Sequence, residues 1–325
     1  MHKLQIKKIK FSDLKRNRYI EIFNSSEKST PFHSLDWLEF IAESNLNLSL
    51  ELVVVLDGCN EIAYLPYFTK KNWPSYWMYL PYGTYSGFIY KEINETKIFE
   101  FLRKKRFVNF ISRLVILDGE KYKNLPYLYG VYDKYVTWIL ETTNPYNDIL
   151  DAIPSKTRNQ IRKAFKEGVT YKKIETVDEL ESCKNLYSML VRKHNISSPY
   201  PYKLFEKLFW FSKKGGDISF NVATHAEQVI AYSVFIMSRT QVFYWLNASN
   251  PEYSSLNATN GILSLMIKSC CENSDVKVFN FGAVPYGNDG LMHFKKNWGA
   301  IERKYGYYNS FIKRLKEKFD GIMGR

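Results

Sequence analysis

The last third of the chain places a lysine after a loop punctuated by glycines. The segment FNFGAVPYGNDGLMHFKKNWGA reads as a strand, a loop and a short amphipathic stretch. Its glycines and candidate reactive residues are Gly282, Gly287, Gly290, Asp289, Phe294 and Lys295. No Gly-Lys-Ser/Thr follows the glycines, so this is not a nucleotide P-loop. The glycines allow a tight loop that wraps a ligand, but spacing alone leaves Lys295 as a surface lysine.

A second segment, SKTRNQIRKAFKEG, is strongly basic and has helical periodicity. Arg158 and Arg162 stand one helical turn apart, so their guanidinium groups can converge on a single anion. This arrangement favours recognition of a phosphate-bearing substrate. The alternative is a solvated basic face with no ligand.

A third segment, FYWLNASNPEYSSLNATNGIL, runs from an aromatic strand through an Asn- and Ser-rich loop into a helix. Backbone N–H groups at such a helix start can hold a phosphate or a carbonyl oxygen. We therefore expect Tyr244 and Asn257 to line a substrate site. Asn257 and Asn260 are also suitable helix caps, which is the alternative reading.

Charge and composition limit the partners. The formal net charge is +13 and the isoelectric point is about 9.3, which favours nucleic acid, phosphorylated substrates or an acidic membrane. Lysine-rich codon usage produces the same charge without a partner. The cysteines and histidines lack metal-ligand spacing, so we expect no metal. The uncharged stretch 72–90 contains too many Pro and Gly residues to span a membrane, and we expect a cytoplasmic protein.

A chain of 325 residues exceeds the usual size of one hydrophobic core, which predicts two domains. The first half shows strands and short helices. The expected strands are 51–56, 61–69, 113–117 and 135–140, and the expected helix is 99–111. The first two strands flank Asp57-Gly58, which predicts a hairpin.

The second half reads as helices, three strands, a helix and a final strand. Pro154 and Gly168 suit the two ends of its first helix. The further helices are expected at 177–195, 202–211 and 259–271, and the strands at 218–225, 228–238, 241–248 and 278–281. The strands 228–238 and 241–248 alternate poorly, which indicates burial on both faces. The first half repeats this order in degraded form, which suggests a duplicated α/β unit.

Together the three segments resemble the FemAB family and its BioF2-like acetyltransferase relatives, a branch of the GNAT-type acyltransferases. The resemblance rests on the Arg-x-x-x-Arg-Lys-Ala core of the basic helix, the Phe-Asn-Phe-Gly strand, Gly-Leu-x-x-Phe-Lys-Lys and Trp-Gly. TPFHSLDWLEF, residues 30–40, resembles the family's opening helix. The chain departs from the family at Leu246, where cell-wall members have an aromatic residue, and at Asn280, where they have Asp.

The resemblance implies an α/β (α+β) fold of two tandem GNAT-like domains, each a mixed, mostly antiparallel sheet flanked by helices. We expect domains at 1–147 and 148–304, with a C-terminal helix, 305–325, that packs on the first. The apolar face of that helix and its lysines also suit contact with an anionic membrane.

The resemblance also implies an N-acyltransferase that moves an acyl or aminoacyl group onto an amine of a cell-envelope precursor, peptidoglycan or a surface glycan. Lys295 matches the lysine at the family's reaction centre, and we expect it to meet the acyl oxygen that gains negative charge. Asp289 is the expected acceptor of the amine proton, and Gly282 and Phe294 are expected to contact the substrate. We expect no tightly bound cofactor, a phosphate-bearing acceptor, and an acyl donor that is aminoacyl-tRNA or acyl-CoA. Two alternatives stay open: an acyl-CoA-dependent N-acetyltransferase for a nucleotide sugar or other small amine, and a non-catalytic binder of RNA or glycan.

Overall fold

The computed structural model describes residues 4–45, 47–70, 81–82, 87–105, 113–117, 129–131, 136–195, 198, 200–284 and 287–309. The chain divides into two compact units. The first contains residues 1–33, 45–136 and 303–325, and the second contains 34–44 and 137–302. The observed division therefore differs from a single boundary at 147/148, because the chain enters the second unit twice.

The first unit contains an antiparallel meander with strand order β1-β2-β3-β4. Its elements are β1 (Leu4–Lys10), α1 (Arg16–Ser25), β2 (Leu48–Asp57), β3 (Asn60–Lys70), β4 (Ile89–Tyr90) and α3 (Glu95–Lys105). Asp57 pairs with Asn60, and Gly58 between them has φ +62°. This two-residue turn needs a left-handed residue, which explains why the predicted hairpin forms at Asp57-Gly58. The part of the expected helix from 106 to 111 lies outside the described residues.

Three further strands pair in the first unit: β5 (Arg113–Leu117), β6 (Tyr129–Val131) and the end of β13 (Ile301–Asn309). β13 pairs antiparallel with both others, from Tyr305 onward in the case of β5. Residues 305–309 are thus a strand, so the expected helix 305–325 does not begin at Tyr305. Its remainder, 310–325, lies outside the described residues, and with it the expected membrane contact.

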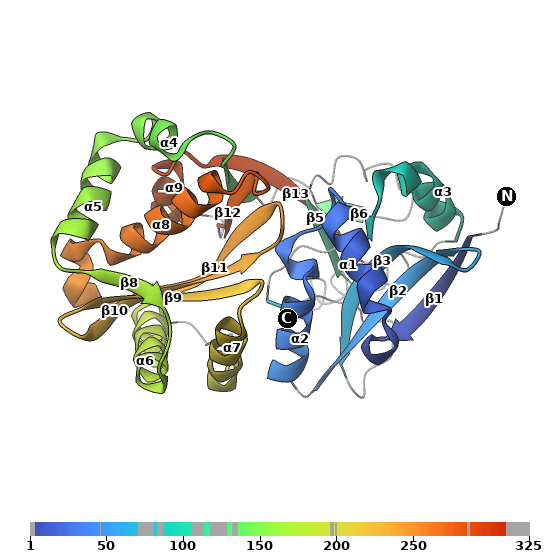
Figure 1. Cartoon of the computed structure of the whole chain (residues 1–325), viewed down its shortest axis with the longest axis horizontal. Coiled ribbons are helices and arrows are strands. Elements are labelled where there is room, and N and C mark those ends of the chain that lie inside the picture. Colours follow the sequence, from blue (N-terminus) through green and yellow to red (C-terminus); the bar gives the residue numbers. More distant parts are fainter. Residues whose placement is uncertain are drawn as a thin grey trace, which may run out of the picture. The chain divides into compact units, whose positions relative to one another are not determined.

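The second unit contains a mixed sheet with strand order β7-β12-β11-β10-β9-β8 (Figure 1). Its strands are β7 (Val136–Glu141, Thr137 onward in this unit), β8 (Thr170–Lys173), β9 (Ile218–His225), β10 (Gln228–Met237), β11 (Gln241–Ser249) and β12 (Val278–Ala283). Its helices are α2 (Leu35–Ser44), α4 (Tyr146–Ala152), α5 (Ser155–Lys166), α6 (Val177–Lys193), α7 (Tyr202–Lys214), α8 (Ala258–Glu272) and α9 (Asp289–Lys296). The β11–β12 pair is parallel, and the pairs β7–β12, β10–β11, β9–β10 and β8–β9 are antiparallel, which confirms the expected fold class.

Helices cover both faces of this sheet. α6 and α8 both pack on β10, and Figure 1 shows α6 and α7 on one side with α4, α5 and α8 on the other. Seven consecutive residues of β10, from Ile230 to Ile236, are buried. The expected burial on both faces is confirmed for β10, and it explains a strand with so little polar alternation.

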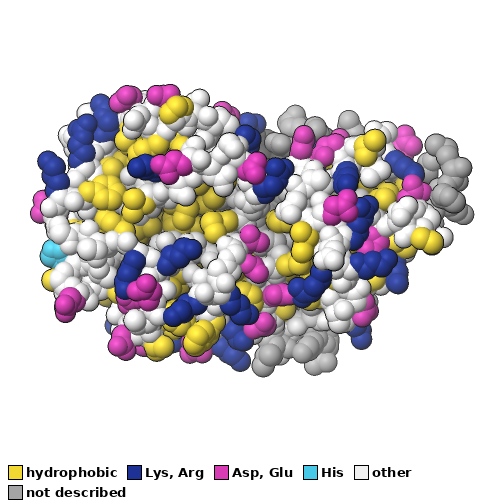
Figure 2. Space-filling model, in the orientation of Figure 1, with side chains coloured by type: hydrophobic (Ala, Val, Ile, Leu, Met, Phe, Trp, Pro, Cys, Tyr) yellow, Lys and Arg dark blue, Asp and Glu magenta, His cyan; other side chains and the backbone are white. Residues whose placement is uncertain are grey.

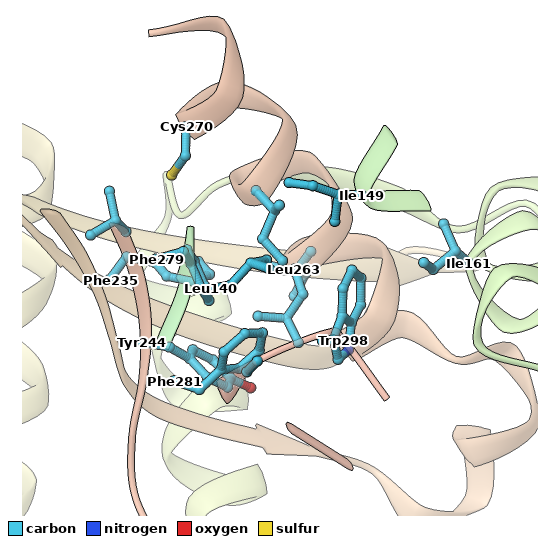
Figure 3. Close-up of a cluster of buried hydrophobic side chains, with 14 of the residues drawn as sticks. Leu140, Ile149, Ile161, Phe235, Tyr244, Leu263, Cys270, Phe279, Phe281 and Trp298 are labelled. Atoms are coloured by element: carbon cyan, nitrogen blue, oxygen red, sulfur yellow. The ribbon is translucent and has the colours of Figure 1, made fainter. Parts of the chain in front are cut away.

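The hydrophobic core that supports the site lies between the sheet and α8 (Figure 3). Phe279 and Phe281 of β12 face it together with Tyr244, and their rings lie 4.8 to 6.5 Å apart. Trp298 closes the cluster and is fully buried. Interlocked rings of this kind hold strand β12 in one position.

Helix α2 belongs to the second unit, although the residues on either side of it belong to the first. Its Trp37 ring stands edge-on to Trp245 of β11 at 5.0 Å. Asp36 Oδ2 accepts the backbone N–H of Asp217 at 2.8 Å. Burial, followed by the neighbouring Asp36 carboxylate, raises the pKa of Asp217 to about 6. The second unit is therefore incomplete without residues 34–44.

Among the described residues no helix has the length and apolar character that a membrane span requires.

Candidate active site

Strands β11 and β12 separate toward the site. Their parallel pairing covers Gln241–Phe243 and Val278–Asn280, whereas β11 continues to Ser249 and β12 to Ala283. On its other side, β12 carries one extra residue relative to β7, because Asn280 pairs with Ile139 but Ala283 pairs with Thr137. This bulge bends the end of β12 and takes its last carbonyl groups out of the regular ladder.

Gly282 makes the bulge possible. Its φ is +77°, a left-handed value that favours glycine. A Cβ atom at this position would lie 3.2 Å from Cζ of Phe243, so the space is also tight. The N–H of Gly282 donates to Asn280 Oδ1 at 2.8 Å, and its carbonyl oxygen, which belongs to the next peptide group, accepts from Lys295 Nζ.

Lys295 reaches these carbonyls from α9. Its Nζ donates to the carbonyl oxygens of Gly282 at 2.8 Å and Ala283 at 3.0 Å, and the residue is only 3% exposed. Burial lowers the pKa of the Lys295 amine to about 7, and no acidic side chain is among its bonding partners in the described residues. An ammonium group has three N–H donors, so one remains for a substrate oxygen. The amine can therefore act as a cation or as a base near neutral pH.

The Trp-Gly pair after α9 fixes the lysine backbone. The N–H groups of Trp298 and Ala300 both donate to the Lys295 carbonyl, at 3.1 and 3.2 Å. Gly299 has φ +76°, which lets the chain turn immediately after the helix. The buried indole of Trp298 anchors this turn in the core. The Trp-Gly turn thus fixes the backbone of Lys295, from which its side chain extends to β12.

The predicted site residues separate into two groups. Gly282 of β12, Tyr244 of β11 and Lys295 of α9 are buried, and Phe294 packs half-buried against the hydrophobic core that contains Tyr244. Burial raises the pKa of the Tyr244 phenol well above its usual value, so this hydroxyl stays neutral. Asp289 is exposed in the first turn of α9, on a different face of the helix from Lys295.

Asn257 does not cap α8 with its side chain. It stands at the N-cap position with left-handed backbone angles, φ +55° and ψ +32°. Its Nδ2 donates to the Ser255 carbonyl at 2.9 Å instead. The capping alternative is therefore wrong for Asn257, because a residue with a left-handed backbone does not aim its side chain at the following N–H groups. Binding of a ligand by this loop stays a prediction.

Arg158 and Arg162 do not converge on one point. Arg158 Nη1 lies within hydrogen-bond distance of the carbonyl oxygens of Leu150, Asp151 and Ile153, at 2.6 to 3.2 Å. These carbonyls belong to the last turn of α4 and the residue after it, where backbone acceptors lack helical partners. Arg162 is exposed, and its Nη1 donates to Asn159 Oδ1 at 3.0 Å. The two guanidinium groups therefore have different partners, because the end of α4 holds Arg158, and substrate binding by this pair stays a prediction.

We expect Arg158→Gln to lower the free energy of unfolding by about 1–3 kcal/mol, since it removes charge-assisted hydrogen bonds from a helix end. Arg162→Gln, one turn along the same helix, should change it by less than about 0.5 kcal/mol. Urea denaturation of both variants measures the difference. Equal stability of the two variants would show that the α4 contacts carry no weight.

Two residues of the site were not predicted as functional. Asn280 is fully buried, and its Oδ1 also accepts the Thr137 hydroxyl at 2.7 Å. The sequence signal was present for Asn280, a polar residue within the apolar run Val278–Phe281. Thr137 gave no signal, because its partner stands 143 positions away.

No group of three or more His, Cys, Asp or Glu side chains is placed to hold a metal ion within the part of the chain that the structure describes.

Residues 155–296 match the family model described as "Acetyltransferase (GNAT) domain". None of the curated proteins matches the chain in sequence. Solved structures match the chain in fold, and the three reported below are 9–12% identical to it in sequence. FemX has a TM-score of 0.70 at 12% identity, with 98% of this chain and 100% of FemX covered.

Two other solved structures are similar to this chain in fold. A tandem GNAT protein from the clavulanic acid biosynthesis pathway has a TM-score of 0.53 at 9% identity and covers 95% of this chain and 99% of its own. The C-terminal domain assigned to a lysylphosphatidylglycerol synthetase of Agrobacterium fabrum has a TM-score of 0.56 at 10% identity, with 90% and 91% covered. The chain therefore shares the fold of FemX and of a tandem GNAT protein, and its residues 155–296 match the GNAT acetyltransferase domain.

Proposed function

We propose that this protein transfers an acyl or aminoacyl group onto the amine of a cell-envelope precursor. One observation carries the proposal: a buried lysine amine, held by two backbone carbonyls, stands at the end of β12 where β11 and β12 separate. A buried lysine without an acidic partner is costly to keep, and such groups are concentrated at functional sites.

The reaction joins the acceptor nitrogen to the acyl carbon and breaks the ester or thioester bond of the donor. Negative charge develops on the acyl oxygen in the transition state. The Lys295 ammonium keeps two N–H groups on the Gly282 and Ala283 carbonyls and directs the third at this oxygen. Contact with an oxyanion stabilises the protonated amine, so its pKa rises when substrate binds.

The acceptor amine also loses a proton. Water takes this proton in the simplest scheme, because Asp289 is exposed and lies on another face of α9 from Lys295. In this scheme Asp289 can receive the proton of the acceptor amine only by way of water. Tyr244 and Phe294 provide apolar surface beside the reaction centre.

A phosphate-bearing substrate agrees with the charge of α5. Four of its basic side chains are exposed: Lys156, Arg162, Lys163 and Lys166. Figure 2 shows Lys and Arg side chains gathered at the edge of the molecule over α5. Such a row attracts phosphate groups of tRNA, a nucleotide or a lipid-linked precursor. With Arg158 engaged by α4, Arg162 becomes the arginine of α5 that we assign to this contact.

The choice of donor has two candidates. The FemX-like fold and the likeness to a protein named for a lysyl product favour an aminoacyl donor, with tRNA as carrier. The match of residues 155–296 to the GNAT acetyltransferase family favours acyl-CoA and a small amine such as an amino sugar nucleotide. A non-catalytic binder would have no use for a desolvated lysine at this position.

A parallel donor assay tests the proposal. The purified protein is given total tRNA charged with labelled amino acids, or labelled acetyl-CoA, each with lipid-linked and nucleotide-linked cell-envelope precursors that carry a free amine. We expect transfer of label from aminoacyl-tRNA, with loss of at least about 100-fold in Lys295→Met. Transfer from acetyl-CoA alone would support the second candidate. Transfer by Lys295→Met at the wild-type rate would contradict the role of Lys295.

A further inference from the structure

Asn280 occupies the centre of a buried hydrogen-bond chain that the proposed chemistry does not yet use. It stands on β12, fully buried, at the last pair before β11 and β12 separate. Its Oδ1 accepts the Thr137 hydroxyl from β7 at 2.7 Å and the Gly282 N–H at 2.8 Å. Both bonds lie within the second unit, so they form part of one core.

The orientation of the amide is fixed by chemistry. A backbone N–H can only donate, so the atom of Asn280 that faces Gly282 must be the oxygen. The amide nitrogen then points elsewhere, and it is buried without a hydrogen-bond partner among the described residues. A buried donor without a partner destabilises the fold, so the presence of Asn280 at this position requires a structural or functional explanation.

The explanation is that Asn280 and Lys295 both form hydrogen bonds with Gly282. Asn280 holds the N–H of this residue, and Lys295 holds its carbonyl oxygen at 2.8 Å. Gly282 is at the bulge with φ +77°, where the backbone ladder does not determine the direction of its carbonyl. The Asn280 side chain therefore holds the peptide group before Gly282, and only the φ and ψ of Gly282 separate that group from the carbonyl that accepts from Lys295.

Among the described residues, the hydrogen-bond partners of the Lys295 amine are two uncharged backbone carbonyls. β12 has no ionisable side chain, and β11 contributes the neutral Tyr244. The charged or titratable residues on the adjoining elements are Glu141 at the end of β7, Asp289, His293 and Lys296 on α9, and Glu302 and Arg303 at the start of β13; all of them are exposed. None of them accounts for the lowered pKa of Lys295, whose cause is burial.

We propose that Asn280 is a positioning residue for Lys295: its amide oxygen orients the Gly282 carbonyl that holds the amine, and its neutrality keeps a counter-charge away from that amine. The catalytic role of Lys295 on which this rests is the one proposed above. An aspartate here would accept the same two hydrogen bonds with the same shape. It would also place a negative charge two hydrogen bonds and one residue away from Nζ, which favours the charged amine.

The test measures the Lys295 amine directly. Trace labelling with acetic anhydride across pH 5.5–11, followed by mass spectrometry of the peptide that contains Lys295, gives its titration midpoint without any activity assay. We expect Asn280→Asp to raise this midpoint by at least about one pH unit. The matched control is Asn247→Asp, which adds the same charge at an exposed position of β11 and should leave the midpoint unchanged.

A second variant separates position from charge. Asn280→Ala removes the acceptor of the Gly282 N–H and adds no charge, so we expect kcat to fall about tenfold with KM nearly unchanged and the Lys295 midpoint to move by less than about 0.5 pH units. If Asn280→Asp does not fold, the kcat of Asn280→Ala still tests the role of Asn280.

The outcomes are distinguishable from failure of the proposed function. An unchanged midpoint in a folded Asn280→Asp, or wild-type kcat in Asn280→Ala while Lys295→Met is inactive, would overturn the role of Asn280. A shifted midpoint together with full activity of Lys295→Met would support the link between Asn280 and the amine and reject the catalytic role of Lys295.

Discussion

Lys295→Met should lose at least about 100-fold in turnover and at the same time become insensitive to a pH change that strengthens the wild-type protein. The loss of turnover follows from removal of the cation that meets the oxyanion, since a single such donor contributes about 3 kcal/mol to transition-state stabilisation. Methionine fits because it fills the space of the buried alkyl chain without its charge.

The pH dependence follows from the lowered pKa of Lys295, about 7 in the folded protein against about 10.4 in an unfolded chain. Below pH 7 the amine is charged in both states, and its burial then weakens the fold. Between pH 7 and 10 the folded state releases the proton while the unfolded state keeps it, so wild-type stability rises with pH. From pH 6 to pH 9 wild type should gain about 3 kcal/mol relative to Lys295→Met.

Urea denaturation at pH 6 and pH 9 measures this gain. Lys296→Met is the matched control, because Lys296 is the next residue of α9, is exposed, and stands 5.5 Å from the Trp138 ring centroid. That variant should follow the wild-type pH dependence. Parallel curves for wild type and Lys295→Met would mean that the amine is solvated rather than buried.

Trp298→Ala should lower the free energy of unfolding by about 3–5 kcal/mol, the largest effect that we expect on stability. The indole is fully buried, and its ring centroid lies 6.4 Å from that of Phe281 (Figure 3). Its removal leaves a cavity beneath the turn that holds Lys295. Thermal unfolding followed by circular dichroism should show a decrease in Tm of about 10 °C.

Trp298→Phe is the conservative control for this prediction. It keeps most of the ring volume, and it removes an indole Nε1 that is buried without a hydrogen-bond partner in the described residues. We expect its cost to be less than half that of Trp298→Ala. If Trp298→Ala melts within about 2 °C of wild type, the Trp-Gly turn does not support the site in the way described.

Local sequence pattern was sufficient for most of the second unit. The strand predictions 218–225, 228–238 and 241–248 nearly coincide with β9, β10 and β11, because short connections and apolar runs mark both their ends. The C-terminal strand was missed for the opposite reason. Residues 305–309 pair with β5, which lies 188 to 196 positions earlier, and a partner so distant leaves no local sign.

The sequence identified Lys295 as the main residue of the candidate site, but it did not show how the side chains of the site are arranged. The glycine loop and the Phe-Lys pair indicated Lys295, but its burial depends on the bulge in β12 and on Trp298. The contact of Arg158 with carbonyl groups at the end of α4 left no sign in the sequence, because backbone acceptors are the same in every sequence. Asn280 stood out in the sequence as a polar residue in an apolar run and as a departure from the family pattern, and its two buried hydrogen bonds explain its presence there.

The placement of α2 has a consequence for synthesis on the ribosome. Trp37 and Phe40 emerge early, yet Trp245, whose ring both of them contact, is translated about 200 residues later. At roughly 5–20 residues per second, α2 waits on the order of ten to forty seconds with an apolar face that has not met its partners. A nascent chain stopped before β11 should therefore bind chaperones through residues 34–44. A truncated protein that begins at Thr137 should aggregate unless those residues are supplied as a separate peptide.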